Sequence, residues 1–86
     1  MKLSAPFRVK INHPDAYWIS IINHELAMAS ASTSEIAFFR EDGSWVIAPI
    51  AEFANYHDGS PSDASTAVYG WVPNDEIKAF LETYRA

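Results

Sequence analysis

An apolar stripe of helical period near the C-terminus sets the first limit on the fold. Ile77, Phe80, Leu81 and Tyr84 recur at i, i+3, i+4 and i+7, so they lie along one side of an α-helix. Asn74, placed just before this stripe, is a residue type that often caps a helix N-terminus. A single amphipathic helix must bury its stripe against another element, and the rest of this chain offers only a β-sheet.

The segments before this helix have the composition and period of β-strands. Residues 7–11 alternate between apolar and polar side chains, and residues 16–22 are mainly aromatic and β-branched. Other segments complete the assignment: strands at 35–40, 45–50 and 67–72, a short strand at 26–29, and one helical turn at 52–56. Eighty-six residues make one domain, residues 1–86. We predict an α+β fold: a twisted antiparallel sheet of four to six strands with one C-terminal amphipathic helix packed on one face.

Two local signals fix details of this sheet. Asp42-Gly43 lies between two apolar runs, which is a strong signal for a β-hairpin in which Gly43 takes a positive φ. Strict alternation along residues 67–72 predicts that Tyr69 and Trp71 share one face of their strand.

The tripeptide His13-Pro14-Asp15 is the one by which J-domain co-chaperones are recognised. In those proteins it follows a basic helix, whereas here strand-forming residues stand on both sides of it. Pro14 fixes its own φ and moves His13 out of the helical region, and Asp15 is a common turn residue. The tripeptide therefore predicts a hairpin loop, not a co-chaperone.

Charge is the most informative part of the composition. The net charge is −5, and no Lys or Arg occurs between Arg40 and Lys78, a window that holds seven Asp and Glu residues. Such a surface repels nucleic acid and anionic lipid, and it attracts a basic protein. We therefore expect no direct nucleic-acid binding and no membrane association.

No motif in the chain indicates catalysis or a cofactor. The absence of cysteine excludes a thiolate zinc site and is consistent with a cytoplasmic location. The histidines lack metal-ligand spacing, and the three glycines form no phosphate-binding loop. A stacking platform of aromatics for single-stranded nucleic acid would need a basic groove, which the charge distribution does not provide. We expect neither a metal, nor a cofactor, nor an enzyme, although a small enzyme is kept as the least favoured reading.

These observations favour a small, acidic, non-enzymatic protein-binding module. In size, charge and lack of cysteine the chain resembles the inhibitors encoded by phages and other mobile elements, including anti-CRISPR proteins. That resemblance implies a partner with a basic, nucleic-acid-binding surface that carboxylates occupy. The alternative is a self-associating, homodimeric accessory or structural protein. The residues expected to contact a partner are Glu41, Asp42, Glu52, Tyr56, His57, Asp58 and Asp63.

Overall fold

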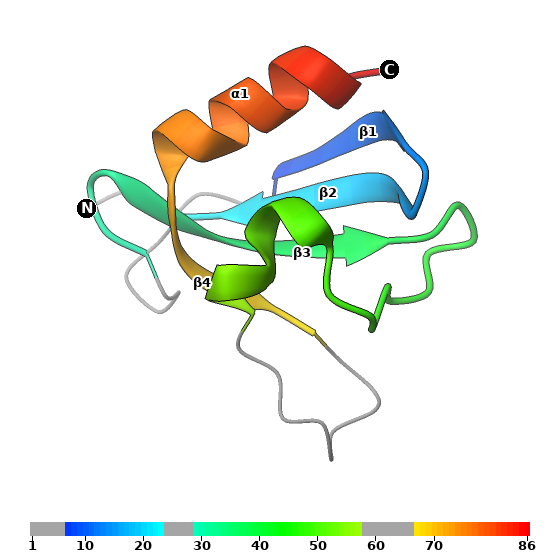
Figure 1. Ribbon diagram of the computed structural model, residues 1–86, viewed down its shortest axis with the longest axis horizontal. Helices are drawn as coiled ribbons and strands as arrows, with labels where there is room; N and C mark the ends of the chain where they lie inside the picture. Colours follow the sequence, from blue (N-terminus) through cyan, green and yellow to red (C-terminus); the bar gives the residue numbers. More distant parts are fainter. Residues whose placement is uncertain (1–6, 24–28, 58–66) are drawn as a thin grey trace.

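In the described residues, an open four-stranded sheet carries one α-helix and one 3₁₀ helix (Figure 1). The structure is a computed structural model and describes residues 7–23, 29–57 and 67–86. In chain order the elements are β1 (Phe7–His13), β2 (Ala16–Ile22), β3 (Thr33–Phe39), η1 (Ala51–Tyr56), β4 (Tyr69–Pro73) and α1 (Asn74–Tyr84). The predicted α+β class, with an antiparallel sheet and a C-terminal helix on it, is confirmed at the lower end of the expected strand number.

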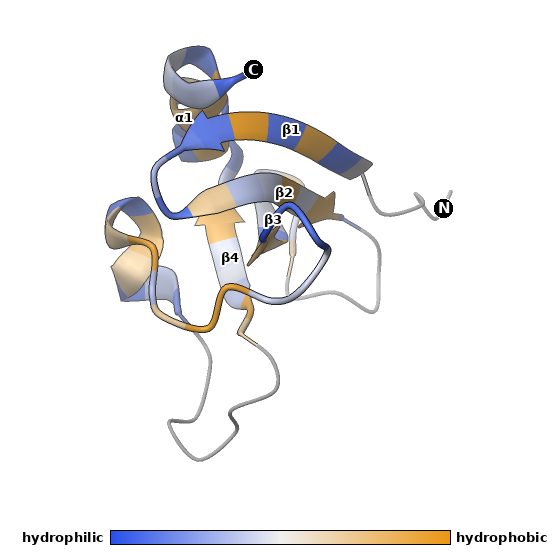
Figure 2. Cartoon of the chain, turned by 90° about the vertical axis from the view of Figure 1, so that its right-hand side faces the viewer, coloured by the Kyte–Doolittle hydropathy of each residue, from blue (hydrophilic) through white to orange (hydrophobic). Residues whose placement is uncertain are grey.

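The sheet order β1-β2-β3-β4 follows the sequence, and each neighbouring pair is antiparallel. Val9 pairs with Ile19, and Ile19 pairs with Phe38, so these three side chains lie on one face, and each of them is buried. Arg8 and Lys10 point to the other face and are exposed. Figure 2 shows this alternation directly as hydrophobic and hydrophilic bands along β1.

The core forms where both helices meet the buried face of the sheet. The ring of Phe38 in β3 lies 6.0 Å from that of Phe53 in η1 and 5.7 Å from that of Phe80 in α1. Phe53 and Phe80 also contact each other, with ring centroids 5.1 Å apart. Beyond α1, Arg85 forms a bridge with Ile11, which places the end of the chain beside the outer edge of β1.

The strand predicted at residues 45–50 does not form. Trp45 makes a single bridge to Phe39, and the Val46 N–H donates to Phe38 O at 3.0 Å. Further on, the Ile50 N–H donates to the hydroxyl of Tyr69 at 2.8 Å, so its partner is a side chain. The chain then enters η1, which contains the predicted helical turn at 52–56.

Other predicted boundaries also differ from the structure. Asn74 is the first residue of α1, and Pro73 before it is the N-cap residue. The Asn74 side chain does not cap the helix but accepts a hydrogen bond from Ser34 Oγ at 2.6 Å. β3 begins at Thr33, two residues earlier than expected. The short strand predicted at 26–29 falls mainly on residues 24–28, outside the described residues.

The prediction that Tyr69 and Trp71 share a face is wrong. Trp71 has a φ of +55°, and the pairing of β3 with β4 shifts register at this point. The irregularity breaks the strict alternation along β4, so Tyr69 and Val72 are both fully buried while Trp71 is 53% exposed. None of the helices in the described residues has the length and apolarity needed to cross a membrane.

Candidate functional site

His13 stands at the turn between β1 and β2, and its side chain points into the molecule. The Asp15 N–H donates to His13 Nδ1 at 3.0 Å, which closes the turn predicted for the tripeptide. The imidazole is only 4% exposed and packs against the rings of Phe80 and Tyr84, at centroid distances of 5.6 and 4.6 Å. Because Nδ1 accepts a hydrogen bond, the proton of the neutral ring is on Nε2.

That proton meets the carboxylate of Glu52 in η1. His13 Nε2 lies 3.2 Å from Glu52 Oε1 and 3.3 Å from Oε2. Burial acts to raise the pKa of the Glu52 carboxyl, but hydrogen bonds from Tyr84, from its own backbone and from His13 together hold that pKa below the ordinary value. Glu52 is therefore charged at neutral pH while its side chain remains 35% exposed.

A second carboxylate faces the first from α1. The Tyr56 hydroxyl donates to Glu76 Oε2 at 2.7 Å, and this bond raises the pKa of the Tyr56 phenol. The hydrogen bond between Tyr84 and Glu52 likewise raises the pKa of Tyr84. Each helix thus supplies one carboxylate and one phenol, and each phenol donates to the carboxylate of the opposite helix.

A cavity of about 330 Å³ opens between these two cross-links. Glu52 and Glu76 line it, and the rings of Phe53, Phe80 and Tyr84 contribute its aromatic surface together with Ala79 and Thr83. We call this cavity the acidic slot. Within the described ranges, neither carboxylate forms an ion pair with a Lys or Arg.

The groups around the acidic slot are suited to binding a cation. Both nitrogens of His13 are occupied by hydrogen bonds, so in this arrangement the ring has no free nitrogen to act as a base. Carboxylates and aromatic faces both attract an ammonium or guanidinium group. In the part of the chain that the structure describes, no three His, Asp or Glu side chains gather as metal ligands would.

Of the predicted partner-binding residues, Glu52 lines the acidic slot, and Tyr56 reaches its edge by donating to Glu76, although Tyr56 does not line it. Glu41 and Asp42 do not line it: they are exposed in the turn after β3, where Ser44 donates to Asp42 Oδ1 through its N–H and its hydroxyl and lowers the pKa of that carboxyl. His57 is half-buried and bridges to Tyr69 as part of the scaffold.

The remaining predicted residues, Asp58 and Asp63, lie outside the described residues. Sequence reasoning did not select His13, Glu76 or Tyr84 for the site. Glu76 belongs to the cation-free window and could have been chosen on charge. Tyr84 was assigned to the apolar stripe, and nothing in its spacing indicates that its hydroxyl reaches η1.

Comparison with known proteins adds no assignment: no protein-family model, no curated protein and no solved structure matches this chain.

Proposed function

We propose that this chain is a non-enzymatic protein-binding module whose acidic slot receives a Lys or Arg side chain of a basic partner. The observation that carries the proposal is the pair Glu52 and Glu76, two carboxylates held by phenols beside an aromatic surface and without a Lys or Arg partner in the described ranges. A bound cation would complete the missing half of this arrangement.

Physical chemistry supports a cation as the ligand. A guanidinium or ammonium group gains charge-assisted hydrogen bonds from the carboxylates and attraction from the ring faces. The tyrosine cross-links fix the carboxylates in advance, which reduces the ordering cost of binding. The net charge of −5 would steer a basic protein toward the module and increase the association rate.

The partner class that fits is a nucleic-acid-binding protein whose basic surface the module would occupy. This is the mode of action that the likeness in size and charge to small phage-encoded inhibitors suggested. Trp71 is the large apolar side chain left exposed among the described residues, and it supplies a candidate aromatic anchor beyond the slot.

The test is a titration with a short peptide of alternating Arg and Gly, followed by NMR. Binding in the slot should shift the side-chain resonances of Phe53, Phe80 and Tyr84, and the affinity should fall with added salt. Glu76→Gln should weaken binding by about three- to fivefold, the range for a partly exposed ion pair.

Glu82→Gln is the matched control, because it removes the same charge from the same helix but Glu82 does not line the slot. Its effect should be smaller than that of Glu76→Gln. An equal loss in both variants would mean that the peptide responds only to net charge, and the slot would be rejected as the binding site.

A further inference from the structure

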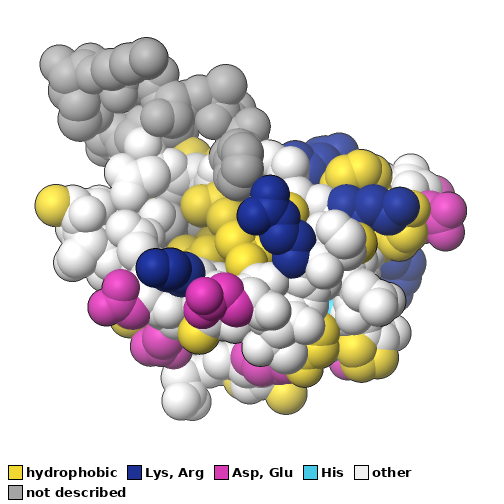
Figure 3. Space-filling model, turned by 90° about the horizontal axis from the view of Figure 1, so that it is seen from above, with side chains coloured by type: hydrophobic (Ala, Val, Ile, Leu, Met, Phe, Trp, Pro, Cys, Tyr) yellow, Lys and Arg dark blue, Asp and Glu magenta, His cyan; other side chains and the backbone are white. Residues whose placement is uncertain are grey.

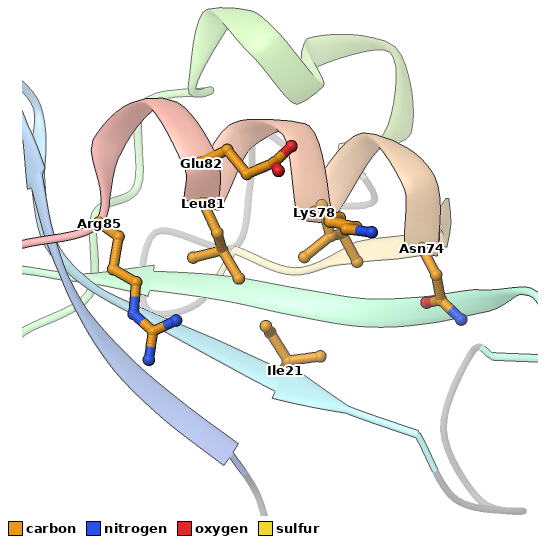
Figure 4. A pocket seen from close by; sticks show the side chains of 7 residues that line it. Ile21, Asn74, Lys78, Leu81, Glu82 and Arg85 are labelled. Atoms are coloured by element: carbon orange, nitrogen blue, oxygen red, sulfur yellow. The ribbon is translucent and has the colours of Figure 1, made fainter.

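A second groove lies on the opposite flank of α1 from the acidic slot. It measures about 440 Å³, and its apolar floor is made by Ile21 of β2 with Ile77 and Leu81 of α1. Figure 4 shows Leu81 and Ile21 pointing toward one another, with η1 on the far side of the helix. The polar rim consists of Asn74, Lys78, Glu82 and Arg85. We call it the cationic groove.

The positive charge of the described chain lies near this groove and on the far side of β1. Lys78 in α1 and Arg85 just after it line the groove, whereas Arg8 and Lys10 lie on the opposite face of β1. These four are all but one of the five Lys and Arg residues in the described ranges. None of the four forms an ion pair with a described carboxylate. Figure 3 shows Lys and Arg side chains around the hydrophobic floor. A chain with a net charge of −5 therefore carries basic side chains at the rim of this groove and on the opposite face of the neighbouring strand β1.

The outer edge of β1 beside this groove has a hydrogen-bonding position that no described residue occupies. The Ala86 N–H donates to Lys10 O at 3.3 Å, so the backbone groups of Lys10 face outward. Because strand backbone groups alternate, those of Arg8 face the same way. No described residue pairs with Arg8 on that side. An unpaired strand edge is a template for an added strand.

Charge decides which strand fits this edge. If two copies of the chain paired antiparallel at Arg8, the Arg8 side chains of both strands would face each other, and like charges directly opposite each other are destabilising. An acidic strand would instead place a carboxylate opposite Arg8, with Lys10 as the next basic side chain on the same face of β1. Arg8 is also held in place, since its guanidinium lies 5.0 Å from the ring of Phe39 and 5.9 Å from that of Trp18.

We propose that β1 and the cationic groove receive an extended acidic segment of a partner protein, added as a strand at Arg8. Alternate side chains of an added strand point to opposite faces of the sheet. Its carboxylates meet Arg8 and Lys10 on one face, and its apolar side chains turn toward the floor between Ile21 and Leu81 on the other. Lys78 and Arg85 attract the same segment from the rim. This surface is separate from the acidic slot and does not depend on it.

The probe is a synthetic peptide that alternates Glu and Val, with a Gln-Val peptide of the same length as control. Strand addition should slow hydrogen exchange at the Arg8 amide, because that N–H becomes hydrogen-bonded. The Glu-Val peptide should bind more tightly than the Gln-Val peptide, and the difference should shrink with salt. Equal binding of the two peptides, or binding without protection of the Arg8 amide, would overturn the proposal.

Two substitutions at one position separate charge from backbone pairing. Arg8→Gln should lower the affinity for the Glu-Val peptide by about two- to fivefold, as expected for one exposed ion pair. Arg8→Pro should abolish binding, because proline also removes the outward N–H. The variant should still fold, because proline is tolerated on strand edges whose N–H faces solvent. Thermal melting confirms that each variant is folded. Equal affinity of the two variants would exclude strand addition.

Further variants distinguish this surface from the acidic slot and from self-association. The double substitution Lys78→Gln with Arg85→Gln should lower the affinity for the Glu-Val peptide, whereas Glu76→Gln should leave that affinity unchanged. If Glu76→Gln weakened it as much, the cationic groove would not be the site. Protection of the Arg8 amide that grows with protein concentration, without any peptide, would show that a second copy occupies the edge and would refute an acidic partner.

Discussion

His13 Nε2 lies 3.2 Å from Glu52 Oε1, across 39 positions of sequence. The contact joins the turn between β1 and β2 to η1, and the ring of Tyr84 from α1 covers it. Three elements that are distant in the chain therefore meet at one imidazole. The tripeptide that contains His13 serves here as a connection between these elements, and the same connection fixes one wall of the acidic slot.

Removing this imidazole should destabilise the fold. His13→Ala leaves the Asp15 N–H and the Glu52 carboxylate without their partner and opens a cavity beside Phe80. We expect a loss of about 2–4 kcal/mol in the free energy of unfolding, measured by urea denaturation. His13→Asn keeps an acceptor near the Asp15 N–H and should therefore lose less stability than His13→Ala. If His13→Ala unfolds at the wild-type urea concentration, the contact does not contribute to stability.

The lowered pKa of Glu52 makes part of the stability pH-dependent. A carboxyl whose pKa is lower in the folded state stabilises the fold above its unfolded pKa, near 4.5, and loses that contribution as pH falls through the folded value. Glu52→Gln should therefore cost about 1 kcal/mol at pH 7 and progressively less below pH 4.5.

Glu41→Gln, which removes the same charge from an exposed turn, is the control for this experiment. Denaturant titrations at pH 7 and pH 3 give the free energy of unfolding that each variant loses relative to wild type at each pH. A Glu52→Gln penalty that is the same at both pH values would show that the carboxylate charge is not what stabilises this site.

The parts of the fold that sequence predicted correctly depend on local periodicity. The stripe containing Ile77 and Phe80 repeats within a few residues, and both are buried as expected. The strand at 45–50 failed for a non-local reason: the Ile50 N–H is taken by the hydroxyl of Tyr69, 19 positions away. The capping role of Asn74 failed in the same way, because Ser34 from β3 takes its side chain. Neither partner can be read from neighbouring residues.

The candidate site was predictable only through its charge. Glu52 and Tyr56 were selected because they lie in the cation-free window. Glu52 lines the acidic slot, and Tyr56 donates to Glu76, which also lines it. The slot itself arises because η1 and α1 exchange hydrogen bonds between phenols and carboxylates. That pairing depends on how both helices pack on Phe38, and no spacing in the sequence encodes it.

Gly43 should be required for its backbone conformation, not for lack of space. Its φ is +88°, and a Cβ built on it would meet no heavy atom within 4 Å. Gly43→Val should cost about 1–3 kcal/mol, because a β-branched residue rarely adopts a positive φ. Gly43→Asn, which tolerates this region, should cost less. Urea denaturation compares them, and equal stability of the two variants would contradict a left-handed residue in the turn.

Trp71 offers a test in which backbone strain and strand propensity predict opposite results. Its φ of +55° lies in the left-handed region, which costs an ordinary L-residue about 1–2 kcal/mol. Asn adopts this region more readily than Val, whereas Val is favoured over Asn in a regular strand. We therefore expect Trp71→Asn to be more stable than Trp71→Val by about 1 kcal/mol.

Both Trp71 variants lose the same large side chain, which is 53% exposed, so its lost packing largely cancels in the comparison. Thermal and urea denaturation of the two proteins give the difference. If Trp71→Val were the more stable variant, residue 71 would have an extended backbone. The register of β4 after Gly70 would then have to be regular, and Val72 could not be buried on the same face as Tyr69.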